Sequence, residues 1–241
     1  MQNTFKVNLV EATLLTSRVR HLKFQREDGI PLEFIPGQFV SFHFMGEEGK
    51  EVRRSYSLAT IPGESSYIEL ALGYVKSGIA SEALFAAKPG DTFNMSGPYG
   101  RLILRDETPK RIILVATNTG VTPYRSMLPA LAAKLENLKV VILLGVQKKE
   151  DALYSTDFLA YAKLYPNFDF RLCYSRENEN NLSEPFEHLG HVQNQFENLN
   201  PLPDSDIVYL CGNPNMIDAA YELLKEKGFN AQQVRREKYV S

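Results

Sequence analysis

The pattern of apolar residues changes near residue 105, and this change constrains the fold more than any other feature of the chain. Before it, short alternating segments are separated by turn signals such as Pro36-Gly37 and Pro89-Gly90. After it, near-continuous apolar segments alternate with stretches of helical periodicity. Alternation is typical of strands with one solvated face, whereas a continuous apolar run is typical of a parallel strand covered on both faces. The sequence therefore predicts two domains, residues 1–104 and residues 105–241.

The first domain is predicted to be a small antiparallel β-barrel. Short segments with strand character follow one another, and turn signals rather than helices separate most of them. One helical segment, residues 78–88, interrupts this order and stops at Pro89-Gly90. The strand candidates are VRHLKFQRE, GQFVSFHF, RRSYSLAT, SYIELALGYV and DTFNMSG.

The second domain is predicted to be a doubly wound α/β domain with a parallel sheet. The apolar segments RIILVAT, KVVILLGV, FDFRLCYS and DIVYLCG alternate with helical patterns that begin near residues 122, 150 and 213. Ligands of open α/β sheets bind outside the carboxyl ends of the strands. Polar and glycine residues follow three of these segments, at Thr117–Pro123, Tyr174–Arg176 and Cys211–Pro214. The polar stretch Glu177–Pro185 is predicted to be a mobile loop.

Composition and charge exclude several classes of protein. A formal charge of -2 argues against a dedicated nucleic-acid binder. The apolar runs are too short to span a bilayer, and the first residues lack the apolar core of a signal peptide. We therefore expect a cytoplasmic protein without a membrane segment. Cys173 and Cys211 are too few for an iron–sulfur cluster, and the histidines show no metal-ligand spacing, so no metal site is expected.

Two stretches of the first domain have the chemistry to hold an anionic ligand. The sequence Arg54-Ser55-Tyr56-Ser57 continues a strand, so Arg54 and Tyr56 share one face. An arginine there can neutralise a pyrophosphate, and an exposed strand is the alternative interpretation. Gly78 to Ser81 opens the helical segment, whose first turn offers unpaired N–H groups and a hydroxyl to an anion. A simple capped helix would have the same sequence.

Taken in order, these motifs resemble the ferredoxin–NADP reductase family over essentially the whole chain. The R-x-Y-S strand and the Gly78–Ser81 segment are followed by Ser96-Gly97-Pro98-Tyr99-Gly100. The second domain then matches with Thr119–Pro123, Cys211-Gly212-Asn213-Pro214 and Glu237-Lys238-Tyr239. The resemblance implies an FAD-binding barrel and an NAD(P)-binding α/β domain whose C-terminal strand covers the flavin.

The resemblance also implies which residues bind FAD. The R-x-Y-S strand would hold the flavin and its pyrophosphate, with the Ser57 hydroxyl at the reactive edge of the ring. The helix start would hold the pyrophosphate. The full set is Arg54, Ser55, Tyr56, Ser57, Leu72, Tyr74, Gly78, Ile79, Ala80 and Ser81.

The nicotinamide coenzyme is expected to bind the loops of the second domain. Thr119–Pro123 resembles the family's G-T-G-x-T-P loop, with Asn118 in the place of the first glycine. Asparagine tolerates a left-handed backbone, so the turn is predicted to be preserved. The implied coenzyme-binding residues are Thr119, Gly120, Thr122, Pro123, Gly145, Ser175, Arg176, Cys211, Gly212, Pro214, Met216 and Tyr239.

Four residues are candidates for a direct role in the reaction: Ser57, Cys211, Glu237 and Tyr239. Cys211 is expected beside the nicotinamide C4, where a thiol would shape the site; a buried apolar role is the alternative. Glu237 would be a proton relay or an electrostatic tuner, or only one charge of a solvated strand. The Tyr239 ring would cover the flavin. Val240 and Ser241 follow it, whereas plant-type members of the family end at the aromatic residue.

The choice of coenzyme depends on the end of the third apolar segment. Ser175-Arg176-Glu177 resembles the S-R-E of family members that use NADP, in which Ser and Arg contact the 2′-phosphate. His191 stands where many bacterial members have a second arginine. We therefore expect NADPH as coenzyme, with modest discrimination against NADH.

The implied activity is hydride transfer between NADP(H) and FAD, with single electrons passing to a separate ferredoxin or flavodoxin. The chain is expected to act as a monomer. Exposed basic residues would steer an acidic partner or would be ordinary surface charges: Arg18, Arg20, Arg53, Lys76, Arg235 and Arg236. The alternatives are a reductase for free flavins or for an oxygenase component, and, from another class, a non-catalytic nucleotide-sensing module.

Overall fold

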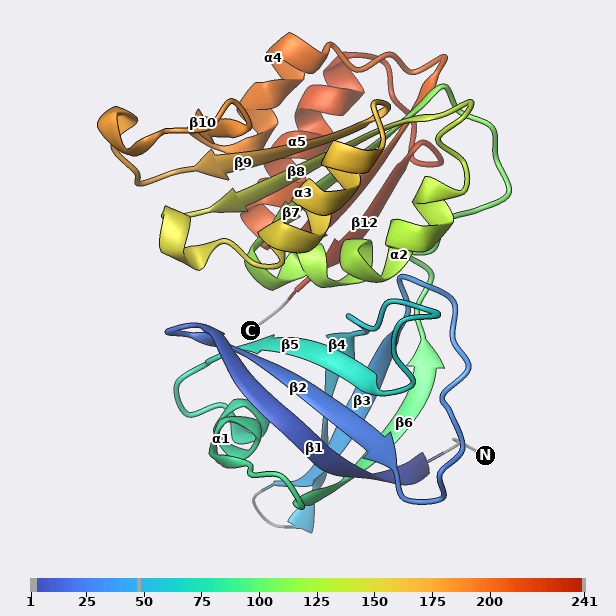
Figure 1. Cartoon of the computed structure of the whole chain (residues 1–241), viewed down its shortest axis with the longest axis vertical. Helices are drawn as coiled ribbons and strands as arrows, with labels where there is room; N and C mark the ends of the chain where they lie inside the picture. Colours follow the sequence, from blue (N-terminus) through green and yellow to red (C-terminus); the bar gives the residue numbers. More distant parts are fainter. Residues whose placement is uncertain (1–3, 47–48, 240–241) are drawn as a thin grey trace. The chain divides into compact units, whose positions relative to one another are not determined.

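The computed structural model describes residues 4–46 and 49–239 and divides into two compact units (Figure 1). Unit 1 comprises Met1–Leu104 together with Thr122–Met127. Unit 2 comprises Arg105–Val121 and Leu128–Ser241. Each unit has its own sheet.

Unit 1 is built on a six-stranded antiparallel sheet in the order β4-β3-β6-β1-β2-β5. The chain just after β4 pairs with β5 through a bridge between Leu58 and Leu70 and through the Ala59 N–H, which donates to the Glu69 carbonyl at 2.7 Å. The two edges of the sheet therefore meet, and the predicted antiparallel barrel is confirmed. Its strands are β1 (Thr4–Thr16), β2 (Val19–Arg26), β3 (Phe39–Met45), β4 (Glu51–Ser57), β5 (Ile68–Gly73) and β6 (Thr92–Tyr99).

The sequence patterns did not identify β1 as a strand, although it lies in the middle of the sheet between β6 and β2. Val7 and Leu9 are fully buried, as strict alternation requires. The register then shifts between Leu9 and Glu11, which breaks the alternation halfway along the strand. A bulge of this kind hides a long strand from a period-two pattern.

The core of unit 1 consists of aromatic and aliphatic side chains inside the barrel. The Phe24, Phe42 and Phe93 rings meet edge to face at centroid distances of 5.3 to 5.9 Å. Helix α1 (Ile79–Ala86) closes the cluster with Leu84. Arg20 of β2 donates to the main-chain oxygen of Leu84 at 2.9 Å and so ties the last turn of α1 to the sheet.

Unit 2 is a six-stranded parallel sheet in the order β10-β9-β8-β7-β11-β12, with helices on both faces. Phe196 of α4 and Ile217 of α5 pack on one face, and Phe158 of α3 stacks on Phe170 at 5.1 Å on the other. The predicted doubly wound domain is confirmed. Its elements are β7 (Arg111–Thr117), β8 (Lys139–Val146), β9 (Phe168–Tyr174), β10 (Glu187–Leu189), β11 (Asp206–Gly212), β12 (Val234–Lys238), α3 (Ser155–Leu164), α4 (Gln195–Leu199) and α5 (Pro214–Glu226). Helix α2 (Thr122–Ala132) is divided between the units, because Thr122–Met127 belong to unit 1 and the rest of the helix belongs to unit 2.

The helices are shorter than the sequence pattern suggested. The pattern starting near residue 150 divides into the 3₁₀ turn η3 (Lys149–Asp151) and α3, because Tyr154 adopts a left-handed conformation with φ 55°. The short elements β10 and α4 carry too few residues to show a period. Within residues 4–46 and 49–239, no helix is long and apolar enough to cross a membrane.

The strand order of unit 2 reverses at β7. From β7 the chain moves outward through β8, β9 and β10, and then returns to the other side of β7 as β11. The loops after β7 and β11 therefore lie at the topological switch point, which is where open α/β sheets bind their ligands.

Candidate functional site

The two loops at the switch point of unit 2 are the ones whose residues were predicted to bind the coenzyme. Asn118–Val121 form the 3₁₀ turn η2 after β7, and Thr122 begins α2. Asn118 has a φ of 48°, which confirms the predicted left-handed turn. The Thr117 hydroxyl accepts from the Asn213 N–H at 2.9 Å and joins the loop after β7 to the loop after β11.

Two glycines let these loops approach each other closely. A Cβ on Gly120 would lie 2.7 Å from the Cys211 carbonyl carbon, 2.8 Å from the Gly212 Cα, and in overlap with the Cys211 oxygen. A Cβ on Gly212 would lie 2.6 Å from the Thr117 hydroxyl, and its φ of 121° also favours glycine. Only glycine fits at either position, because atoms of the facing loop occupy the space that a Cβ would take.

The candidate residues Cys211, Glu237 and Tyr239 come together on one face of the sheet. Cys211 pairs with Glu237 across β11 and β12, and the Tyr239 N–H donates to the Gly212 carbonyl at 2.8 Å. Burial raises the pKa of the Cys211 thiol well above its usual range, and the Glu237 charge raises it further. The thiol is therefore neutral at physiological pH. Val240 and Ser241 lie outside the described residues.

One buried polar atom fits a bound phosphate at the start of α2. The Thr122 hydroxyl is buried and has no hydrogen-bond partner among the described residues. It stands at the first position of the helix, where N–H groups lack intrahelical partners, and Pro123 at the next position needs none. An orphaned hydroxyl beside free N–H groups suits the pyrophosphate of a dinucleotide.

Three predicted coenzyme residues have a packing role in the structure. Gly145 leaves room for Val192, whose Cγ1 would lie 2.8 Å from an added Cβ. Met216 belongs to the core cluster under α5, on the face of the sheet opposite to Cys211. Pro214 starts α5, and the Asn213 side chain before it caps the helix by accepting from the Asn215 N–H at 2.8 Å.

Ser175 and Arg176 lie exposed at the carboxyl end of β9. Their main-chain N–H groups donate to Val146 and Gln147 oxygens at 3.0 and 2.9 Å, which fixes the backbone beside β8. The Arg176 guanidinium forms no hydrogen bond or ion pair within the described part of the chain. It is therefore available to an anionic ligand.

In unit 1 the R-x-Y-S strand is β4, at the edge of the sheet next to β3. Arg54 is exposed, and Tyr56 is half-buried with its ring 5.8 Å from Phe42. Burial raises the pKa of Tyr56 to about 12, so it stays a neutral ring with a hydroxyl. Ser55 shares a 2.9 Å hydrogen bond with Ser41 on the other face, and Ser57 is buried at the end of the strand.

The segment predicted to hold the FAD pyrophosphate starts α1, with Gly78 as N-cap residue and Ile79 and Ala80 in the first turn. The Ser81 hydroxyl accepts from the Val75 N–H at 2.7 Å, so it shapes the preceding loop. The remaining donors toward an anion are the first N–H groups of the helix.

The two remaining predicted FAD residues lie on either side of Gly73. Leu72 is in the barrel core. The Tyr74 ring is exposed and meets Phe85 edge to face at 5.1 Å. Only Tyr74 therefore presents a surface to a ligand.

Two of the basic residues expected to steer a partner are not free surface groups, and the expectation was wrong for them. Arg20 caps α1, as described above. Arg235 is buried and bonds the Tyr209 hydroxyl and the Glu107 carboxylate. Both make contacts with residues far away in the sequence, which no local pattern reveals. Arg18 and Lys76 are exposed, and the Tyr74 N–H donates to the Arg18 carbonyl at 2.8 Å, which brings their segments together.

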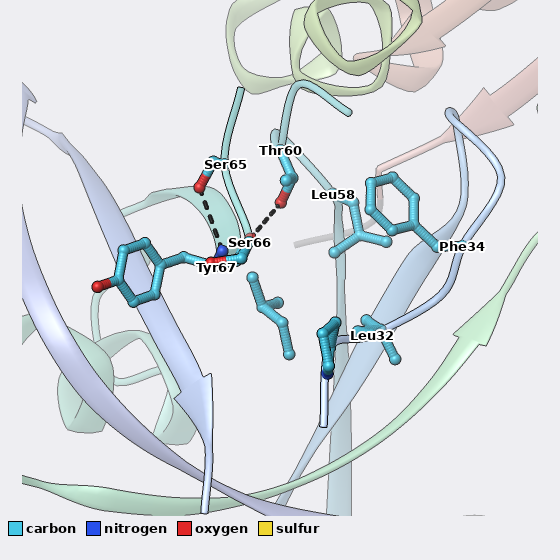
Figure 2. Close-up of a pocket in the computed structure, with 9 residues that line it drawn as sticks. Leu32, Phe34, Leu58, Thr60, Ser65, Ser66 and Tyr67 are labelled. Atoms are coloured by element: carbon cyan, nitrogen blue, oxygen red, sulfur yellow. Dashed lines mark hydrogen bonds between the residues drawn. The ribbon is translucent and has the colours of Figure 1, made fainter. Parts of the chain in front are cut away.

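Unit 1 also contains a small cavity of about 80 Å³ between the loop before β3 and the chain that leads into β5. Figure 2 shows Leu32, Phe34 and Leu58 around it, with Thr60 bonded to the Tyr67 carbonyl at 2.9 Å. Ligand pockets usually measure about 300–1,000 Å³. The cavity is therefore too small for a dinucleotide, and none of the predicted site residues lines it.

Three polar side chains of unit 1 are hydrogen-bonded in the order of a hydrolytic triad. His43 Nε2 lies 2.7 Å from the Ser96 hydroxyl, and Nδ1 lies 2.6 Å from a Glu51 carboxylate oxygen. Ser96 is buried in β6, and its hydroxyl is already hydrogen-bonded to His43. The array satisfies the buried Ser96 hydroxyl and the buried His43 ring, and its third member, Glu51, is exposed.

Comparisons with known proteins match both units. The family described as "Oxidoreductase FAD-binding domain" matches residues 6–103. The family described as "Oxidoreductase NAD-binding domain" matches residues 114–222.

Relatives of known name cover the chain to different extents. "Ferredoxin--NADP reductase B" of Sorangium cellulosum is 32% identical over 98% of this chain and 97% of its own length. "Phenol hydroxylase P5 protein" of Acinetobacter pittii is 25% identical over 98% of this chain but only 66% of its own length. The chain spans 51% to 66% of the length of several other relatives, so parts of those proteins have no counterpart here.

The fold is also that of solved reductases. A ferredoxin NADP⁺ reductase from Neisseria gonorrhoeae, solved with bound FAD and NADP, superposes with a TM-score of 0.83 at 18% identity and covers 99% of both chains. The full-length relative and the two matched domains establish the class. The chain belongs to the ferredoxin–NADP reductase family and is an FAD- and NAD-binding oxidoreductase.

Proposed function

We propose that this chain transfers hydride between NADPH and bound FAD and passes single electrons to a separate ferredoxin or flavodoxin. The observation that carries the proposal is the contact of two glycine-containing loops at the switch point of unit 2, beside Cys211, Glu237 and Tyr239. Open α/β sheets bind dinucleotides outside the carboxyl ends of the strands at this point of the sheet, and these two loops lie there.

On the flavin side, the contribution of the protein would come from β4 and the start of α1. When bound, FAD supplies the ability to take up a hydride and to release its two electrons singly. The exposed Arg54 would neutralise the pyrophosphate together with the first N–H groups of α1. Tyr56, neutral and supported by Phe42, would hold the ring system, and Ser57 would offer a hydroxyl at its reactive edge.

On the coenzyme side, the neutral Cys211 would shape the nicotinamide pocket without reacting. A thiol whose pKa is raised by burial and by the Glu237 charge is a poor nucleophile at neutral pH. Glu237 would retain a negative charge near the nicotinamide ring. The Thr122 hydroxyl and the helix N-terminus behind it would bind the coenzyme pyrophosphate.

The preference for NADPH is supported by the environment of Arg176. Its guanidinium is exposed and unpaired within the described part of the chain, next to the Ser175 hydroxyl. A guanidinium of this kind binds a dianionic 2′-phosphate in a bidentate way. NADH lacks that phosphate and would bind more weakly.

A ferredoxin or flavodoxin as the electron partner is supported by the name of the relative that this chain matches over its full length. Relatives named as hydroxylase or monooxygenase proteins favour a second candidate, the reductase component of an oxygenase system. The exposed Arg18 and Lys76 would attract an acidic partner in either case.

Cytochrome c reduction by NADPH tests the proposed partner. We expect the rate to depend on added ferredoxin or flavodoxin and to fall as the salt concentration rises, because screening weakens attraction between exposed charges. A rate that is already maximal without either carrier, or that responds only to free flavin, would favour the alternative reductase.

A further inference from the structure

We propose that Glu187 is a positioning residue for coenzyme discrimination, because its carboxylate fixes the three chain segments that surround the predicted 2′-phosphate ligands. The inference rests on the proposed function and deepens it, since it concerns how NADPH is distinguished from NADH. Glu187 begins β10. It belongs to none of the sequence motifs described above, and the family resemblance did not identify it.

The Glu187 carboxylate is completely buried and accepts hydrogen bonds on both oxygens. Its side chain is 0% exposed. One oxygen accepts from the Tyr174 hydroxyl at 2.9 Å and from the Lys149 ammonium at 2.7 Å. The other accepts from the main-chain N–H groups of Ser183 at 2.9 Å and Glu184 at 3.2 Å. Burial alone would raise the pKa of Glu187, but the bonds from Lys149, Ser183, Tyr174 and Glu184 lower it to about 2.

The donors come from three separate segments. Tyr174 is the last residue of β9 and directly precedes Ser175 and Arg176. Lys149 begins η3, just after β8. Ser183 and Glu184 close the polar stretch that the sequence predicted to be a mobile loop. A charge-assisted bond to a buried carboxylate is lost if any segment moves, so the carboxylate restrains all three.

Further contacts tie the same region together. Glu177 accepts from the Lys149 N–H at 3.3 Å and from the Asn181 side chain at 2.7 Å. The Gly190 N–H donates to the Tyr174 carbonyl at 2.8 Å, which sets the position of the following residue, His191. Glu187 therefore lies at the centre of the segments that carry Ser175, Arg176 and His191.

This arrangement explains how an exposed arginine discriminates. A flexible Arg176 on a free loop would lose conformational entropy when it binds a phosphate. With its backbone held through Tyr174 and β8, the guanidinium is closer to its bound geometry before the coenzyme arrives. Lys149 contributes little charge of its own, because the Glu187 carboxylate neutralises it.

The substitution Glu187→Gln tests the proposal because glutamine keeps the volume but has one acceptor oxygen. It can satisfy either Tyr174 or the Ser183–Glu184 turn, and it leaves the other donors facing an NH₂ group. The matched control is Glu184→Gln, which removes a charge from the same turn at an exposed side chain. It keeps the Glu184 N–H that Glu187 accepts. Tyr174→Phe, which retains the carboxylate and removes one donor, provides a second test if Glu187→Gln fails to fold.

Binding of NADP⁺ and NAD⁺ to the FAD-loaded protein is measured by calorimetry, and kcat and KM are measured with NADPH and NADH. We expect Glu187→Gln to raise the Kd for NADP⁺ and the KM for NADPH about 10-fold, with kcat and the NAD⁺ affinity unchanged within about twofold. Tyr174→Phe shifts the same two values by about threefold. Glu184→Gln changes none of them.

Three different results would overturn the proposal and can be told apart. A wild-type protein that binds NADP⁺ no more tightly than NAD⁺ removes the proposed NADPH preference, and this inference with it. A wild-type preference that Glu187→Gln and Tyr174→Phe leave intact overturns the role of Glu187 alone. Equal weakening of both coenzymes, or a fall in kcat with both, assigns Glu187 a purely structural role.

Discussion

Replacing Gly120 with alanine tests whether the contact between the two loops of unit 2 positions the coenzyme. The added Cβ would lie 2.7 Å from the Cys211 carbonyl carbon and 2.8 Å from the Gly212 Cα, against an ordinary contact distance of at least 3.4 Å. The obstructing atoms are main chain at the end of β11, which is paired with β7 and β12 on both sides. The loop must therefore move, by about 1 Å, and a misplacement of that size costs about 100-fold in rate.

The assay is anaerobic reduction of the bound flavin by NADPH in a stopped-flow instrument. We expect Gly120→Ala to retain FAD, because the predicted flavin residues are in unit 1, and to be reduced about 100-fold more slowly. The matched control is Gly228→Ala, at a φ of 92° after α5, where the added Cβ would meet only Pro203 Cγ at 3.7 Å. It should lose about 1–2 kcal/mol of stability and keep its rate.

Reduction of Gly120→Ala at the wild-type rate would contradict a role of the loop contact in positioning the coenzyme. A loss of FAD in proportion to the loss of rate would also contradict it, since the loop would then contribute to flavin binding. A rate loss that Gly228→Ala shares would show that lower stability alone is responsible.

Three further predictions follow from named contacts. Ser57→Ala is expected to keep its FAD and to be reduced about 10-fold more slowly, because one hydrogen bond at the reacting ring is lost; an unchanged stopped-flow rate would contradict this. Arg176→Gln should raise the KM for NADPH about 10-fold in steady-state assays and leave that for NADH unchanged. The carboxyls of Glu69 and Glu187 have pKa values of about 2 when folded, against 4.5 for the free group, so each stabilises the fold above pH 4.5 and loses that effect as the pH falls toward 2. Urea unfolding of Glu187→Gln should therefore show a loss of about 3 kcal/mol at pH 7 that shrinks below pH 4.5.

The sequence predicted the parts of the fold that depend on local pattern. Continuous apolar runs identified β7, β8, β9 and β11, because both faces of those strands are covered. The left-handed turn at Asn118 was predicted correctly, since few other residue types tolerate that backbone. The bulge in β1 and the brevity of β10 and α4 removed the periodicity that would have identified them.

Contacts between distant residues could not be predicted in this way. Arg20 donates to the carbonyl of Leu84 in α1, 64 residues further along the chain. Arg235 is buried and bonds the Glu107 carboxylate, 128 residues away in the sequence. The sequence predicted both to be surface charges. Whether a charged side chain is buried depends on a partner that is distant in the sequence, and the adjacent residues do not reveal that partner. Glu187 is the same case, with donors drawn from three segments. The sequence therefore predicts the partners of buried charged side chains least well.

The most direct test of the proposed function is anaerobic titration of the purified protein with NADPH, followed by visible absorbance. We expect a yellow protein that contains FAD and is bleached faster by NADPH than by NADH. A colourless protein that takes up no added FAD would contradict it, as would bound flavin that neither coenzyme reduces.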